Sequence, residues 1–144
     1  MTSLSPQQLA EAAAAAMLAS DRASKHIGIA LEAVSPGTST MGMTVEDHLV
    51  NGLEVCHGGY IFSLADTAMA FASNSANIPN LAQSAQITFL APARLGDRLT
   101  AIATETARAG RNGIYDVAVR NQTGVLIAVF RGQTRAIKGE VAPQ

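Results

Sequence analysis

The sequence predicts an α+β fold, in which an antiparallel sheet of five to six strands wraps around one long central helix, with an extra helix at the N-terminus. Three observations predict it. Residues 5–19 are rich in strong helix formers, and residues 60–72 are almost entirely apolar or small, without glycine or proline. Segments of alternating apolar residues, separated by short turns, lie on both sides of that apolar stretch.

The first element expected is a helix over residues 5–19. Ser5 fits the N-cap, Pro6 fits the first helical position, and an alanine run follows. Asp21 is expected to cap a second, short helical turn, which Gly28 ends. At 144 residues the chain has the length of one domain. We therefore interpret residues 1–144 as a single domain and residues 1–26 as its N-terminal helical extension.

The strands are expected before and after the apolar stretch. Apolar residues alternate from Ile27 and again after the Pro36-Gly37 turn signal, which predicts a hairpin. Four more strands are expected from Ser84 onward, with turns at Pro92, 96–97, 110–113 and 121–124. Turns this short join antiparallel strands, because parallel neighbours need a crossover of about a dozen residues or more.

The stretch from Tyr60 to Ala72 predicts a helix of about four turns, which Pro79 stops. A surface helix has one polar face, but this one is apolar around most of its circumference, so we expect burial on nearly all sides. Ala65 and Ala68, together with Ala72, form a seam of small residues that allows close packing on the sheet. A sheet curled around one buried helix is called a hotdog fold.

Composition disfavours several classes of protein. The lone cysteine, Cys56, cannot form an intramolecular disulfide, and with three histidines it gives no closely spaced zinc ligands, so no metal is expected. No window reaches 18 uninterrupted apolar residues and no secretory signal is recognisable, so the expected location is the cytoplasm. A net charge of −1 and the lack of tryptophan give no reason to expect nucleic-acid binding.

The charge is unevenly distributed along the chain. Residues 26–93 carry five acids and no lysine or arginine, whereas residues 94–144 carry eight bases and four acids. The basic half either faces an anionic ligand, such as a phosphorylated cofactor, or forms an ordinary solvated surface.

Asp66 is the candidate catalytic carboxylate. It is the one acid between Val55 and Gly96, in the middle of the predicted buried helix, where an ionised carboxylate is costly unless it is paired, hydrogen-bonded or functional. The structural interpretation is a hydrogen bond to Ser63 or Thr67, or a place at a subunit interface. The functional interpretation is a general base or a nucleophile.

A second candidate group lies where this helix begins. Helix N-termini present unpaired amides and a positive dipole end, which suit an oxygen that becomes negative in a transition state. Gly58 and Gly59 are therefore candidate oxyanion donors, with His57 placed to orient the reacting group. The alternatives are an ordinary tight turn and a structural histidine.

The spacing of the two groups predicts a dimer. Gly58 and Asp66 are eight residues apart, which places them roughly 12 Å apart along a helix axis. A base and an oxyanion donor must both come within about 3 Å of the reacting atoms. We therefore expect Gly58 of one subunit and Asp66 of another to complete each site across a two-fold axis.

Four sequence blocks carry a family resemblance. They are NGLEVCHGGYIFSLADTAMAFASNS (residues 51–75), ITFLAPARLGD (87–97), NGIYD (112–116) and VFRG (129–132). Together they closely resemble the PaaI-type hotdog acyl-CoA thioesterases of aerobic phenylacetate degradation, over about residues 27–138. The resemblance implies that Asp66 is the catalytic carboxylate, that Gly58 donates to the thioester carbonyl, and that His57 and Asn51 position substrate or water.

The resemblance further implies a thioesterase acting on phenylacetyl-CoA or on ring-hydroxylated or other aromatic relatives. It implies a dimer of dimers that uses no metal and no cofactor, since CoA is part of the substrate. Whether Asp66 attacks directly or activates water stays open. The further candidates for substrate binding are Gly59, Tyr60, Thr67, Arg111 and Arg131, with Lys138 also considered for the CoA phosphates.

Two other functions remain open at this point. A hotdog hydratase or dehydratase would use Asp66 and His57 at the Cα and Cβ positions of an acyl thioester. A non-catalytic acyl-CoA-binding module would bind ligand without turnover.

Overall fold

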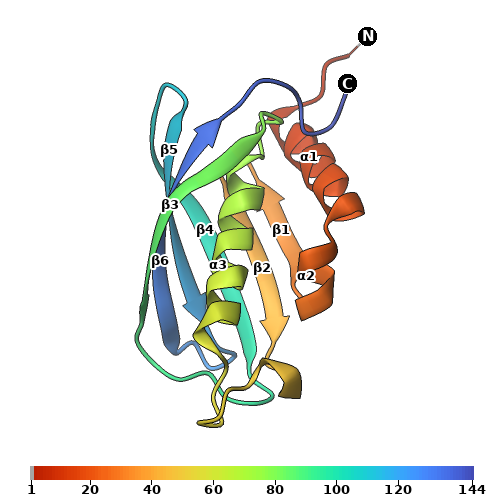
Figure 1. The fold of residues 1–144 in the computed structure, drawn as a ribbon. Helices are drawn as coiled ribbons and strands as arrows, with labels where there is room; N and C mark the ends of the chain where they lie inside the picture. Colours follow the sequence, from red (N-terminus) through yellow and green to blue (C-terminus); the bar gives the residue numbers. More distant parts are fainter. Residues whose placement is uncertain (1) are drawn as a thin grey trace.

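The computed structural model describes residues 2–144 and shows one sheet curled around a central helix (Figure 1). This confirms the predicted hotdog arrangement, with a helix of 15 residues and one of 6 residues before the sheet. The elements follow in the order α1 (Pro6–Ser20), α2 (Arg22–Ile27), β1 (Ala30–Ser35), β2 (Thr38–Thr44), the 3-10 turn η1 (Asp47–Leu49), α3 (Gly58–Ser73), β3 (Asn80–Phe89), β4 (Arg98–Ala109), β5 (Asn112–Arg120) and β6 (Leu126–Ala136).

The six strands form one sheet in the order β1-β2-β4-β5-β6-β3, and every neighbouring pair is antiparallel, as predicted. The chain leaves β2, crosses the concave face of the sheet as α3, and returns as β3 at the opposite edge (Figure 1). β3 pairs only with β6, from Asn80 opposite Ala136 to Phe89 opposite Ala128. One side of its backbone is therefore left unpaired within the single chain.

The N-terminal helices begin and end at the predicted signals. Ser5 caps α1 in a reciprocal capping box with Gln8, Asp21 caps α2, and Gly28 ends α2 in a left-handed conformation. The buried residues of α1 are Ala10, Ala13 and Ala14. The alanines themselves thus make the docking face, and small side chains let α1 lie close to the rest of the domain.

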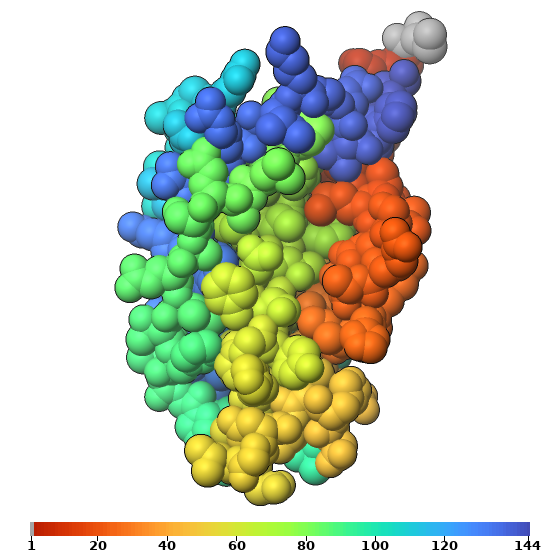
Figure 2. Space-filling view, viewed as in Figure 1, coloured from red at the N-terminus to blue at the C-terminus, as the bar shows by residue number. Residues whose placement is uncertain are grey.

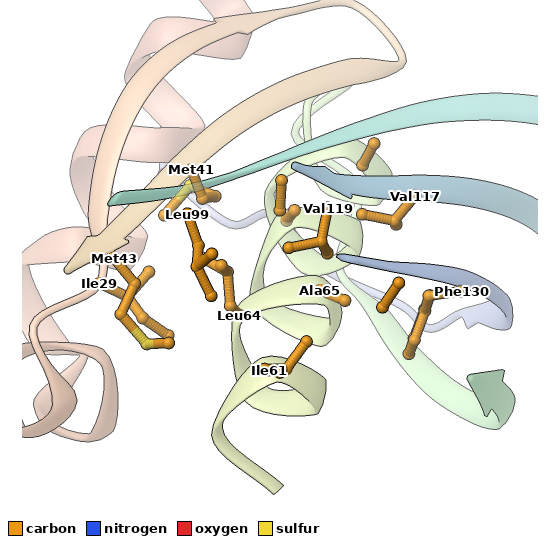
Figure 3. Packing of buried hydrophobic residues seen from close by; sticks show 14 of the residues in the cluster. Ile29, Met41, Met43, Ile61, Leu64, Ala65, Leu99, Val117, Val119 and Phe130 are labelled. Carbon is orange, nitrogen blue, oxygen red and sulfur yellow. The ribbon is translucent and has the colours of Figure 1, made fainter. Parts of the chain in front are cut away.

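The inner face of α3 packs into the core. Ala65, Ala68 and Ala72 are fully or almost fully buried, which confirms the small-residue seam. Alternate residues of β4 and β5, including Leu99 and Val119, point toward the helix (Figure 3). The sheet can approach the helix axis closely because the seam has no long side chains.

The prediction that α3 is buried on nearly all sides is wrong. One face stays open in the single chain, which we call the open stripe; it comprises Gly59, Phe62, Ser63, Asp66, Thr67 and Ala70. Its members are exposed or only half-buried and recur at the three- and four-residue spacing of one helix face. Small and weakly polar residues also occur in protein cores, so the sequence pattern did not distinguish this exposed face from a buried one.

β3 also differs from its predicted start. It begins at Asn80, four residues before the predicted start at Ser84. Nearly all of its side chains are exposed, with Leu81 60% and Phe89 50% accessible. An edge strand that is exposed on both faces lacks the apolar alternation from which the start of a strand is predicted. Of the helices in residues 2–144, none is long and apolar enough to span a membrane.

Candidate active site

The first backbone amides of α3 differ in their hydrogen-bond partners. His57 is the N-cap, and its Nδ1 accepts a hydrogen bond of 2.9 Å from the Gly59 amide. The Tyr60 amide donates to the His57 carbonyl at 3.0 Å. Within residues 2–144 the Gly58 amide has no hydrogen-bond partner. Gly58 is therefore the open donor, and the prediction that Gly59 shares this role is wrong, because His57 occupies its amide.

His57 has a defined tautomer in this arrangement. A ring nitrogen that accepts an amide hydrogen carries no proton, so the proton of the neutral imidazole lies on Nε2. The ring also packs edge-on against Tyr60, with centroids 5.9 Å apart. His57 thus fixes the first turn of α3 and keeps one outward donor.

Asn51 holds the loop that leads into α3. Its Oδ1 accepts from the amides of Leu53 at 2.9 Å and Val55 at 3.4 Å. The side-chain oxygen is therefore committed to the loop, and the Nδ2 group is the part of Asn51 that remains for a ligand.

Asn51 and Gly58 share a hollow of about 390 Å³ with the segment that follows β3. Its lining also includes Cys56, Phe89 and Pro92. A Cβ added to Gly58 would come within 2.9 Å of the Phe89 ring, so glycine leaves the space between the helix start and that ring open. Burial raises the pKa of the Cys56 thiol to about 11, which leaves it a protonated wall residue at neutral pH.

Asp66 lies on the open stripe, in a different hollow of about 220 Å³. Ser63 and Thr67 do not bond to it, because their hydroxyls donate to the backbone carbonyls of Gly59 at 2.9 Å and Ser63 at 2.6 Å. The structural interpretation of Asp66 as a partner of these hydroxyls is therefore wrong. Burial raises the pKa of the Asp66 carboxyl above its usual range.

One chain does not bring Gly58 and Asp66 together. α3 is continuous from Gly58 to Ser73, so the roughly 12 Å of helix between the two residues holds. The two hollows have no lining residue in common. A single copy therefore offers an oxyanion donor and a carboxylate at two separate places.

The other candidate residues are scattered. Thr67 lines the hollow of Asp66, and Tyr60 packs on His57. Arg131 forms a bidentate pair with Asp116, with both nitrogen–oxygen distances at 2.8 Å, which offsets its charge. Arg111 is exposed in the β4–β5 turn, at the end of the sheet where β3 begins. Within one chain that is the end opposite Gly58.

Two groups of lining residues were not predicted from the sequence. Phe89 and Pro92 line the hollow of Gly58, but the block ITFLAPARLGD that contains them indicated only a strand, a turn and the family resemblance, not a site. Ala23 and Ile27 of α2 line the hollow of Asp66, whereas Phe62, which lines it too, was expected among the residues that shape the acyl pocket. Nothing in the local pattern of α2 indicates that it lies beside a residue forty positions later.

Comparisons with known proteins agree on one family. The model of the thioesterase superfamily matches residues 53–128. An acyl-coenzyme A thioesterase PaaI of Escherichia coli is 39% identical over 126 residues, which are 88% of this chain and 90% of that protein.

Comparison with solved structures supports the same family. The E. coli PaaI protein from the phenylacetic acid degradation operon superposes with a TM-score of 0.92 at 38% identity, covering 94% of this chain and 99% of its own. A variant of the phenylacetic acid degradation protein PaaI from Thermus thermophilus gives a TM-score of 0.78 at 29% identity, covering 81% and 100%.

Proposed function

We propose that this chain, which belongs to the thioesterase superfamily and is an acyl-CoA thioesterase, acts on phenylacetyl-CoA and on ring-hydroxylated or other aromatic acyl-CoA thioesters. In this proposal each site is completed by two copies of the chain. The observation that carries the proposal is the pairing of two incomplete sites on one helix. Gly58 offers a donor without a carboxylate, and Asp66 offers a carboxylate without a donor.

The spacing along α3 defines how two copies fit. Phe62 lies four residues from Gly58 and four from Asp66. Two α3 helices that pack antiparallel about a two-fold axis at Phe62 bring Gly58 of each copy level with Asp66 of the other. The open stripe, which is uncovered in one chain, faces the other copy in this arrangement.

The unpaired edge of β3 is consistent with the same two-fold axis. β3 runs beside α3 in Figure 1 and has an unpaired edge over ten residues. Long exposed edges with apolar side chains, here Leu81, Phe89 and Leu90, favour pairing with another strand. Antiparallel pairing of β3 with its copy continues the sheet across the axis and buries these side chains.

The proposed chemistry needs only these residues and water, with no cofactor. The thioester carbonyl oxygen accepts from the Gly58 amide at the positive end of α3, while His57 and Asn51 position substrate or water. Asp66 of the other copy either takes a proton from the attacking water or attacks the carbonyl carbon to form an anhydride that water then cleaves. In both routes the C–S bond breaks, the sulfur leaves as the CoA thiolate and takes up a proton, and the acid is released.

The antiparallel arrangement also accounts for the basic half of the chain. It brings the Arg111 end of one copy toward the Gly58 end of the other, where CoA leaves the site. Arg111 and Lys138 are exposed there, whereas Arg131 already neutralises Asp116. We assign the CoA phosphates to Arg111 first.

The test is thiol release from phenylacetyl-CoA and from hexanoyl-CoA by wild type, Asp66→Asn and the control Asp47→Asn, an exposed carboxylate in η1. Turnover that prefers the aromatic thioester, is lost in Asp66→Asn and is kept in Asp47→Asn supports the proposal. Equal turnover in wild type and Asp66→Asn overturns the role of Asp66. Because Cys56 is buried, the protein adds little thiol to the background.

We further propose that two dimers associate into a tetramer in the cytoplasm, where CoA thioesters are made and used. Ile102 and Val129, on the outer face of the sheet, are 48% and 40% exposed and offer an apolar surface for that contact. Light scattering after size-exclusion chromatography measures the mass of the assembly. A mass of four times 14.9 kDa supports the tetramer, whereas twice 14.9 kDa limits the assembly to the dimer.

A further inference from the structure

The hollow around Asp66 is built by two helices that are far apart in the sequence. Its lining residues come from α2 and the residue just before β1 on one side and from α3 on the other; they are Ala23, Ser24, Ile27, Ile29, Phe62, Ser63, Asp66 and Thr67. Figure 2 shows α2, in orange, lying beside the yellow-green turns of α3 at the surface. The N-terminal extension thus forms a wall of the place into which the carboxylate opens.

The polar groups of this hollow are already committed, apart from one. The Ser24 hydroxyl donates to Asp21 at 2.6 Å, and those of Ser63 and Thr67 donate to carbonyls of α3. Within residues 2–144, Asp66 has no hydrogen-bond or ion-pair partner. The hollow therefore combines apolar side chains, hydroxyls that already have partners and one unpaired carboxylate, which suits an apolar group attached to a reacting carbonyl.

The size of the hollow matches one aromatic ring and a short linker. An apolar cavity of about 150 Å³ holds benzene, so a hollow of about 220 Å³ has room for a ring and a methylene group. Phe62 packs edge-on against Phe130, with centroids 5.4 Å apart, which fixes its ring in the wall. Aromatic side chains held in this way favour edge-to-face or offset contact with a second ring.

The wall formed by α2 is held at both ends. At its start, Asp21 accepts from the Ser24 amide at 2.9 Å as well as from the hydroxyl. At its end, Gly28 adopts a left-handed conformation, and the Ile29 amide donates to the Ser24 carbonyl at 2.9 Å. Caps at both ends hold α2 in helical form, so Ala23 and Ile27 keep their spacing along this wall of the hollow.

We propose that α2 determines which acyl groups fit, with Ala23 and Ile27 as the specificity-determining residues and Phe62 as the opposite wall. The aryl end of the acyl group lies between α2 and Phe62, while the pantetheine leaves through the Gly58 hollow of the other copy. This inference rests on the proposed function, because it assumes that the thioester carbon lies beside Asp66.

The test compares ratios of kcat/KM, which do not change when a variant merely lowers the amount of active enzyme. Ala23→Leu adds bulk to the hollow, and the matched control Lys25→Leu adds the same side chain at an exposed position of α2 that does not line the hollow. The phenylacetyl-CoA to propanoyl-CoA ratio is expected to fall at least about tenfold in Ala23→Leu, since a misfit of one methylene changes kcat/KM by about 10–200-fold. In Lys25→Leu it is expected to stay at the wild-type value.

A second variant tests the opposite direction. Ile27→Ala widens the hollow, so the ratio of 3-phenylpropanoyl-CoA to phenylacetyl-CoA is expected to rise. Unchanged ratios in both Ala23→Leu and Ile27→Ala, in an enzyme that still cleaves thioesters, overturn the role of α2 and leave the proposed function intact. A wild-type protein that cleaves no thioester overturns the proposed function itself.

Discussion

The replacement of Gly58 by proline isolates the one atom on which the proposed oxyanion site depends. Proline has no amide hydrogen, and it is well tolerated at the first position of a helix. His57 has ψ 131°, the extended conformation that a following proline requires. Since the Gly58 amide has no partner within residues 2–144, Gly58→Pro removes no structural hydrogen bond and leaves α3 able to form.

The control is Gly58→Ala, which keeps the amide. Both variants place a Cβ about 2.9 Å from the Phe89 ring, so the displacement of that ring is common to both and cancels when their rates are compared. We expect the displaced ring to cost about 1 kcal/mol, which is less than tenfold in rate. Loss of an oxyanion donor costs a further 10²–10³ in kcat, or about 2.7–4 kcal/mol.

The assay is kcat/KM for phenylacetyl-CoA by thiol release, with circular dichroism and thermal melting to confirm that both variants fold. Gly58→Pro is expected to be at least about a hundredfold slower than Gly58→Ala. Equal rates in the two folded variants would refute the assignment of the Gly58 amide as the donor to the carbonyl.

Three further predictions concern the half-buried Asp66 and the buried Thr134. The raised pKa of Asp66 places the acid limb of the kcat/KM profile above the pH of an ordinary aspartate, and a limb at or below that pH contradicts Asp66 as the base or nucleophile. Above its raised pKa the ionised Asp66 carboxylate lowers the stability of the folded state, and this destabilisation disappears as the pH falls below the pKa of the unfolded chain. Asp66→Asn should therefore raise the melting temperature at pH 8 but not at pH 3. No gain at pH 8 would contradict this prediction. The Thr134 hydroxyl is buried and has no hydrogen-bond partner among residues 2–144, so Thr134→Val should stabilise the fold by about 1–2 kcal/mol in urea unfolding at fixed protein concentration. The control is Thr100→Val at a half-buried position, and a loss of stability in Thr134→Val would reveal a partner for the hydroxyl.

The sequence was sufficient where one local signal determines one element. Ser5, Asp21 and Gly28 are caps whose chemistry acts over three or four residues, so the ends of α1 and α2 were predictable. The seam of Ala65, Ala68 and Ala72 likewise follows from helical spacing alone.

The sequence was insufficient where the answer depends on packing between distant segments. The open stripe of α3 contains glycine, serine, threonine and alanine, which are common on buried and exposed faces alike. The choice between Gly58 and Gly59 as donor depends on where the His57 ring turns, and the Arg131 charge is offset by Asp116, fifteen residues earlier. The wall that α2 forms beside Asp66 exists only in the folded chain.

The central claim, that each site takes Gly58 from one copy and Asp66 from the other, can be tested by combining two inactive variants. Asp66→Asn and Gly58→Pro are co-expressed with different affinity tags, and the mixed dimer, at twice 14.9 kDa by light scattering, is purified through both tags. The mixed dimer holds one site with both Gly58 and Asp66 intact, so we expect about half of the wild-type activity per dimer, although each parent is inactive. Mixed dimers as inactive as their parents would show that both groups act within one chain and would contradict the account.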